Sequence, residues 1–135
     1  MSIEARVEEI KEDLDFFEDE LQKYEYIIDL GKKLEPLDDE HKIPANLVHG
    51  CTSQVWLIVE KKDDRLYFTG TSDAIIVKGL VYMILQIFSG STIEELKDTD
   101  MDIVHELKLA EVVTPNRQSG VIGMIKKIKE YANKM

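Results

Sequence analysis

The chain has 135 residues, of which 44% are hydrophobic, enough to bury a single core without disulfides or a metal. Its 27 acidic and 17 basic residues give a net charge of -10, which disfavours binding to nucleic-acid phosphates or anionic lipid. The N-terminus lacks the basic start and apolar core of a signal peptide, and no stretch reaches the about 18 apolar residues that cross a bilayer. We therefore expect one soluble, cytoplasmic domain, residues 1–135, that binds neither nucleic acid nor membrane.

The first quarter of the chain has the apolar spacing of an amphipathic helix. Its apolar residues recur at steps of three or four: Ile3, Val7, Ile10, Leu14, Phe17, Leu21, Tyr24 and Ile28. The acidic cluster between Asp13 and Asp19 predicts a break, because Asp favours helix N-caps and disfavours helix interiors. We expect two helices, the second ending near Gly31, where glycine can adopt the left-handed C-terminal conformation. A polar connection, residues 32–46, follows.

Two β-rich stretches and one apolar stretch make up the centre of the chain. Residues 54–61 and 65–71 are rich in β-branched and aromatic residues and are separated by a short charged turn, which predicts a β-hairpin. Residues 74–88 are almost wholly apolar, which predicts a helix buried on most sides and lying across the inner face of the hairpin. Ser72 and Asp73 precede this helix, and either side chain can cap its first turn.

The last third of the chain predicts further helices. Ser91 followed by Glu94 has the spacing of a capping box at the start of a short helix, and residues 102–109 predict another. Thr114-Pro115 predicts the start of the last helix, with a cap and a proline at its first position. The order of helices, hairpin and helices indicates an α+β fold, a small antiparallel sheet built on a β-hairpin and covered by helices.

Cys51 is the only cysteine of the chain. It follows a glycine and comes shortly before the first predicted strand, so we expect it on a loop held by a scaffold, where reactive residues are often placed. Free cysteines are also often small buried residues without chemistry, so both interpretations stay open at this point. A single cysteine can neither form an internal disulfide nor by itself complete a thiolate site for zinc or an iron–sulfur cluster. We expect no metal and no cofactor.

Few other residues point to chemistry. His49 lies two residues from Cys51 and, when protonated, would favour its thiolate; the alternative is an ordinary histidine on a surface loop. Arg117 falls in the first turn of the last helix, where the helix dipole disfavours a cation. It is explained either by an ion pair, with Asp73 or another acid, or by contact with a partner or substrate. His41 has no partner at metal-ligand or triad spacing and is interpreted as a surface residue.

Four segments, in their order along the chain, resemble the SufE family of sulfur-acceptor proteins. They are KYEYIIDLGKKLEPL (residues 23–37), HGCTSQVWL (49–57), GTSDAIIVKGL (70–80) and TPNRQSGVIGMI (114–125). The resemblance covers nearly the whole chain and places Cys51 at the family's acceptor cysteine. It implies a SufE/IscU-like fold.

The resemblance also implies a function for Cys51. The thiolate would take sulfur from a persulfide on a SufS-type cysteine desulfurase, stimulate that enzyme, and pass the sulfur to a SufBCD-type cluster scaffold. The pyridoxal cofactor would belong to the desulfurase, so the chain is not expected to be an enzyme itself. The expected docking residues beside Cys51 are His49, Gly50, Ser53, Gln54, Asp73 and Arg117.

Two departures and two alternatives accompany this interpretation. Many members of the family have proline at the position of His49, and often asparagine or glutamine at that of Ser119. The chain could instead activate a desulfurase by docking alone, with Cys51 structural. It could also assemble clusters, like the fold-related IscU and NifU proteins, although these use several cysteines. Whether it is a monomer or a homodimer stays open.

Overall fold

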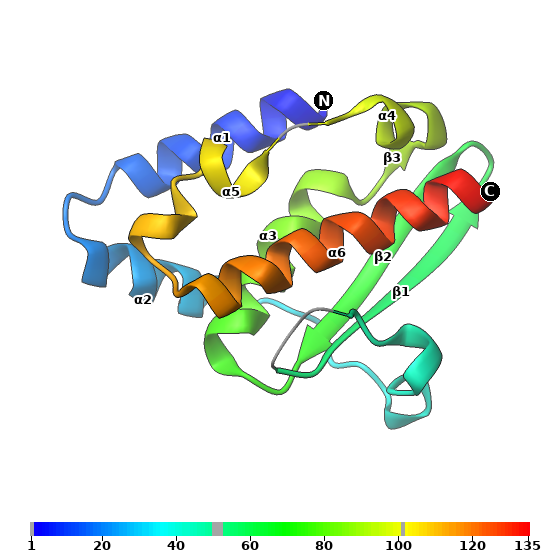
Figure 1. The fold of residues 1–135 in the computed structure, drawn as a ribbon, viewed down its shortest axis with the longest axis horizontal. Helices are drawn as coiled ribbons and strands as arrows, with labels where there is room; N and C mark the ends of the chain where they lie inside the picture. The colour runs from blue at the N-terminus through cyan, green and yellow to red at the C-terminus, as the bar shows by residue number, and fades with distance from the viewer. Residues whose placement is uncertain (1, 50–52, 101) are drawn as a thin grey trace.

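The computed structural model describes residues 2–49, 53–100 and 102–135 (Figure 1). Along the chain, helices come first, then a β-hairpin, then further helices, which confirms the predicted α+β fold. The elements are α1 (Ile3–Asp15), α2 (Glu20–Gly31), η1 (Asp39–His41), η2 (Pro44–Asn46), β1 (Val55–Lys62), β2 (Arg65–Ser72), α3 (Ile75–Phe88), β3 (Ser91–Thr92), α4 (Ile93–Asp98), α5 (Ile103–Glu106), η3 (Leu109–Glu111) and α6 (Pro115–Lys134).

The N-terminal helices break where the acidic cluster predicts, because Asp19 caps α2 by accepting a hydrogen bond from the backbone of Leu21 at 2.8 Å. Helix α2 ends at Gly31 as predicted, but for a different reason. Among the described glycines only Gly90 has a positive φ, and Lys32 after Gly31 has a φ of -69°, so no left-handed turn is formed. A β-carbon at Gly31 would instead lie 2.7 Å from the backbone nitrogen of Gly79, so this glycine allows α2 to approach α3 closely.

The hairpin is antiparallel and continues without interruption from the pair Val55 and Ser72 to the pair Lys62 and Arg65. In the described residues, β2 also pairs with the short strand β3, which gives the strand order β1-β2-β3. Alternate residues of β2 are buried, so one face of the sheet turns toward the core. Helix α3 packs against β2 on this face, and Tyr131 of α6 reaches the ring of Phe68 there.

Helix α3 is the centre of the core, as its apolar sequence predicts. Its buried residues lie on most of its circumference: Ile76, Val77, Gly79, Leu80, Val81, Met83, Ile84, Ile87 and Phe88. Within the described residues, no helix is both long enough and apolar enough to cross a membrane.

Two details of the last third differ from the prediction. The capping box is formed one residue later than expected, by Thr92 and Glu95, because Ser91 is buried in β3 and accepts a hydrogen bond from the Arg6 guanidinium. The helix predicted over residues 102–109 is shorter, since Lys108 adopts a left-handed conformation with φ of 53°. Helix α6 begins at its predicted proline.

Candidate functional site

Residues 49–54 lead into strand β1 from the polar stretch that follows α2. We call them the Cys51 segment. Gly50, Cys51 and Thr52 lie outside the described residues, so the predicted loop position of Cys51 and the docking role of Gly50 stay predictions. The described residues on either side show how the segment is held.

The two ends of the Cys51 segment are joined to each other by backbone pairing. The backbone nitrogen of Val48 donates to the carbonyl oxygen of Val55 at 2.8 Å, and Leu47 forms an antiparallel bridge with Trp56. Val48 and Val55 are both buried. The segment thus starts and finishes at the same edge of the sheet, against strand β1.

Ser72 and Asp73 hold the C-terminal end of the segment at Gln54. The hydroxyl of Ser72 donates to the carbonyl oxygen of Gln54 at 2.7 Å, and the backbone nitrogen of Asp73 donates to the same oxygen at 3.3 Å. In return, the backbone nitrogen of Gln54 donates to the carboxylate of Asp73 at 3.1 Å. Ser72 is only 3% exposed.

The prediction that Ser72 or Asp73 caps the first turn of α3 is therefore wrong, although the Ser72 hydroxyl accepts from the backbone nitrogen of Ala74 at 3.3 Å. The N-cap of α3 is Ala74, without a hydrogen bond from its side chain. The physical reason is the hairpin register: because Val55 lies opposite Ser72, the next residues outward are Gln54 and Asp73, which face each other across the hairpin. The Asp73 carboxylate reaches across to β1 rather than along the chain to the helix.

Arg117 contacts the Cys51 segment directly. Its Nη1 donates to the hydroxyl of Ser53 at 2.5 Å, joining two residues that are 64 positions apart in the sequence. The ion pairs formed among the described residues do not include Arg117, so the predicted ion pair with Asp73 is not formed. A cation at the start of α6 is thus explained by its bond to the residue two positions after Cys51.

His49 is exposed, and its backbone lies against α6 at Gly123. A β-carbon on Gly123 would lie 2.5 Å from the carbonyl oxygen of His49, so only glycine permits this approach without displacement. One turn further along α6, Lys127 donates from Nζ to the carbonyl oxygens of Ala45 and Leu47, at 3.1 and 2.8 Å. Burial lowers the pKa of Lys127 below its ordinary value.

An open groove of about 470 Å³ lies where α6 passes His49. We call it the α6 groove, and its lining residues are His49, Ser119, Ile122, Gly123, Lys126, Lys127 and Glu130. Ile122 is 58% exposed although it is a large apolar residue. One of its lining residues, His49, precedes Cys51 by two positions in the sequence.

The predicted site residues that the structure describes all lie at the two ends of the Cys51 segment. His49 lies at one end, Ser53 and Gln54 lie at the other, and Asp73 and Arg117 hold that second end. Sequence reasoning missed two supporting residues, Gly123 and Lys127, and gave a third, Ser72, a different role. A glycine inside a helix costs about 1 kcal/mol relative to alanine, so Gly123 was a detectable sign of a close approach.

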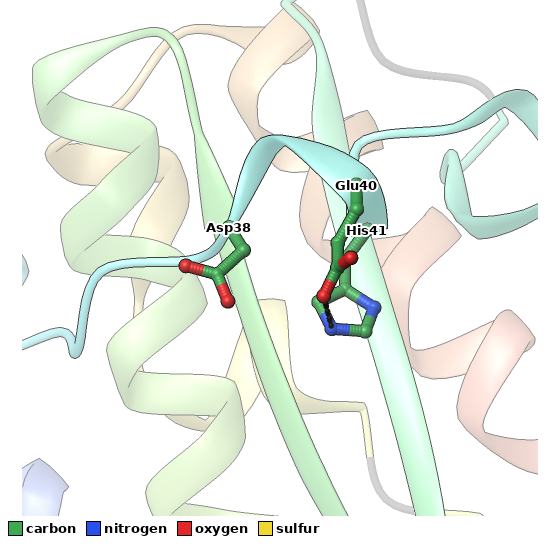
Figure 2. A group of neighbouring side chains, drawn as sticks. All are labelled: Asp38, Glu40 and His41. Atoms are coloured by element: carbon green, nitrogen blue, oxygen red, sulfur yellow. Dashed lines mark ion pairs between the residues drawn. The ribbon is translucent and has the colours of Figure 1, made fainter.

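His41 is exposed, as predicted, but two residues with potential ligand atoms lie beside it. One potential ligand atom each from Asp38, Glu40 and His41 lies within 4.8 Å of the others, and Figure 2 shows Glu40 and His41 facing each other. The His41 Nε2 and Glu40 Oε1 atoms are 3.6 Å apart. All three residues are exposed on the short helix η1 and its approach. None of the hydrogen bonds around Ser53, Gln54 and Asp73 involves this group.

The fold has a match among solved structures. The chain is similar to a hypothetical protein from Thermus thermophilus whose solution structure is known, with a TM-score of 0.77. The match covers 96% of this chain and 94% of the other, at 15% sequence identity, and it therefore supports the fold alone.

Sequence comparisons identify the family. Residues 8–132 match the SufE family model, described as an Fe-S metabolism associated domain. The chain is 38% identical over 133 residues to an uncharacterized SufE-like protein of Rhizobium etli, covering 95% of this chain and 90% of that protein. It is 37% identical over 114 residues to a SufE-like protein of Synechocystis, covering 84% of this chain and 72% of the relative. The chain belongs to the SufE family, which is associated with iron–sulfur metabolism.

Proposed function

We propose that this chain is a sulfur acceptor and carrier in cytoplasmic iron–sulfur cluster assembly. Cys51 takes sulfur from a persulfide on a SufS-type cysteine desulfurase, stimulates that enzyme, and passes the sulfur to a SufBCD-type scaffold. Membership of the SufE family and the single cysteine support this function. The observation that carries it furthest is the set of contacts that hold both ends of the segment bearing Cys51.

The chemistry is a thiol–persulfide exchange. The Cys51 thiolate attacks the terminal sulfur of the desulfurase persulfide, a new sulfur–sulfur bond forms, and the old one breaks. The desulfurase cysteine leaves as a thiolate, and Cys51 becomes a persulfide. A thiolate on the receiving protein then attacks the terminal sulfur in the same way. Each step transfers one sulfur atom with no net change in electron count, so the exchange needs no cofactor on this chain.

The described contacts hold both ends of the segment that contains Cys51. Only residues 49–54 separate Val48 from Val55, whose backbones are hydrogen-bonded to each other. Arg117 and Asp73 hold the second half of this short segment through Ser53 and Gln54. A segment held at both ends loses less conformational freedom when a partner docks on it than a free loop does, which favours sulfur transfer at this position.

An exposed apolar residue favours a protein partner at this site. Ile75 begins α3 two residues after Asp73 and is 66% exposed. Large apolar residues flanked by polar ones are typical of protein interfaces. The proposed docking surface comprises the Cys51 segment and its neighbours: His49, Gly50, Ser53, Gln54, Asp73 and Arg117.

The direct test is mass spectrometry of the full chain after incubation with its SufS-type desulfurase and L-cysteine. The wild-type chain is expected to become one sulfur atom heavier at Cys51, whereas Cys51→Ser is expected to stay unlabelled. An unlabelled wild-type chain in the presence of an active desulfurase would contradict the proposal.

The same variant separates sulfur transfer from activation by docking. If Cys51→Ser stimulates the desulfurase as strongly as wild type does, Cys51 is not the acceptor, and the chain acts by docking alone. We expect the stimulation to be lost, because a desulfurase persulfide without an acceptor blocks the next turnover. Cluster assembly on the chain itself would appear as cluster absorbance after anaerobic reconstitution, which we do not expect with a single cysteine.

A further inference from the structure

Helix α6 touches the Cys51 segment on two sides. Arg117 donates to Ser53, which follows Cys51, and Gly123 lies against His49, which precedes it. Successive residues of an α-helix are rotated by about 100°, so Ser119 and Lys126 lie about 180–200° around the axis from Arg117. The α6 groove and the Arg117 contact thus lie on opposite faces of one helix.

The charge of α6 is opposite to that of the chain. The helix contains five cations and one carboxylate, within a chain whose net charge is -10. Two of these lysines, Lys126 and Lys127, line the α6 groove together with His49. The field of such a helix attracts acidic partners, while the acidic remainder of the chain repels them.

The groove residues differ in what they can offer a partner. The Nζ of Lys127 is already held by two backbone carbonyls. Lys126 is exposed, and the ion pairs of the described residues do not include it. Ile122 provides exposed apolar surface beside it. This combination fits a protein segment that carries an apolar side chain flanked by carboxylates.

We propose that the α6 groove docks the protein that receives sulfur from Cys51, through an acidic segment with an apolar side chain at its centre. This inference rests on the proposed function, in which Cys51 must face two proteins in turn. On the Arg117 side of the segment the exposed carboxylate of Asp73 offsets the cation Arg117, whereas the groove has two lysines, Lys126 and Lys127, and one carboxylate, Glu130. Surfaces of different charge select different partners, so donor and receiver approach Cys51 from opposite sides of α6.

The test compares loading of Cys51 with unloading of Cys51. The full chain is loaded with ³⁵S from labelled cysteine by the desulfurase, isolated, and mixed with the purified SufBCD-type scaffold. Lys126→Glu is expected to slow transfer to the scaffold about tenfold, and Ile122→Ala about threefold. Loading is expected to stay within about twofold of wild type for both variants, because the donor binds the other side.

Lys134→Glu is the matched control, because it makes the same charge change on the same helix at an exposed residue outside the groove. It is expected to transfer sulfur at the wild-type rate. In 0.5 M NaCl the screening length falls to about 4 Å, which weakens the attraction between Lys126 and an acidic partner. The transfer rates of wild type and Lys126→Glu are therefore expected to differ less at this salt concentration. Melting curves confirm that each variant is folded, and Ile122→Ala tests the groove without any change of charge.

The outcomes separate this inference from the proposed function. Wild-type transfer rates in both groove variants would overturn the docking site, and so would a defect confined to loading, which would assign the groove to the donor. If Cys51 of the wild-type chain does not load at all, the proposed function fails. In that case the affinities of unloaded wild type and unloaded Lys126→Glu for the immobilised scaffold are compared. Equal affinities would overturn the groove as the docking site.

Discussion

The core around α3 and the surroundings of the Cys51 segment are built from different contacts. The core is apolar and continuous, from Ile27 of α2 through the face of the hairpin to Met124 of α6. The Cys51 segment is held by a few polar contacts to the backbone of Gln54 and the hydroxyl of Ser53, each made by one identifiable residue. Core stability is therefore shared by many side chains, whereas the position of the segment depends on single ones. Substitutions in the two regions should separate stability from sulfur transfer.

Phe88→Ala is expected to have the largest effect. Phe88 is 1% exposed, and removing a buried aromatic side chain costs about 3–5 kcal/mol of unfolding free energy. Urea unfolding followed by circular dichroism measures this loss. Sulfur loading of the folded fraction should be unchanged, so slower loading per folded molecule would contradict the separation of the two regions.

Two glycines that face carbonyl groups provide a sharper comparison. A β-carbon at Gly79 would lie 1.9 Å from the carbonyl oxygen of Ile27 within the core, and one at Gly123 would lie 2.5 Å from that of His49. We expect Gly79→Ala to lose about 2–3 kcal/mol, because close-packed helices cannot separate without opening the core.

Gly123→Ala is expected to change the free energy of unfolding by less than about 1 kcal/mol. The higher helix propensity of alanine stabilises α6, and this gain offsets the cost of displacing the backbone at His49. Sulfur loading should nevertheless slow by roughly three- to tenfold, since the Cys51 segment is shifted from its position. Denaturant unfolding and ³⁵S loading of both glycine variants check this pair. Equal stability losses in the two variants would remove the distinction between the regions.

Asp73→Ala removes the carboxylate that accepts from the backbone of Gln54. We expect a loss of about 1 kcal/mol in unfolding free energy and slower loading of Cys51. Asp73→Asn is the matched control, because its side-chain oxygen can still accept the same hydrogen bond. If the Asn variant loads as slowly as the Ala variant, the charge of Asp73 matters to the partner rather than the hydrogen bond to the segment.

The bond between Arg117 and Ser53 is expected to contribute less to stability. A double-mutant cycle with Arg117→Ala and Ser53→Ala should give a coupling of about 0.5 kcal/mol in unfolding free energy. A coupling near zero would show that the two side chains do not interact in solution.

The smallest effect at neutral pH concerns Tyr26, at the edge of the core between α1 and α2. Burial, and then the charge and hydrogen bond of Asp13, raise the pKa of Tyr26 from 10.0 to about 12. A raised pKa means that the folded state keeps the proton longer, so this stability is complete below pH 10 and is lost as pH rises toward 12. Unfolding of wild type and Tyr26→Phe from pH 8 to pH 12 should show a steeper decline in wild type.

Several elements were predictable from the sequence because their signals are local. The break before Asp19, the hairpin and the apolar helix α3 each follow from spacing or composition within a few turns of chain. The capping box was misplaced because Ser91 and Thr92 both have an acidic residue three positions later, and only the pairing of Ser91 in β3 selects Thr92. Similarly, the role of Asp73 depends on the register of the hairpin, which places it opposite Gln54.

The sequence by itself determined the order of elements, the α+β class, the single cysteine and the family, because these depend on residue type and local period. Only the tertiary structure decided which distant residues hold the Cys51 segment. Arg117 meets Ser53 across 64 positions, and Lys127 meets Ala45 across 82. Such contacts depend on how α6 packs over the sheet, and no local pattern encodes that packing. The groove beside His49 exists for the same reason.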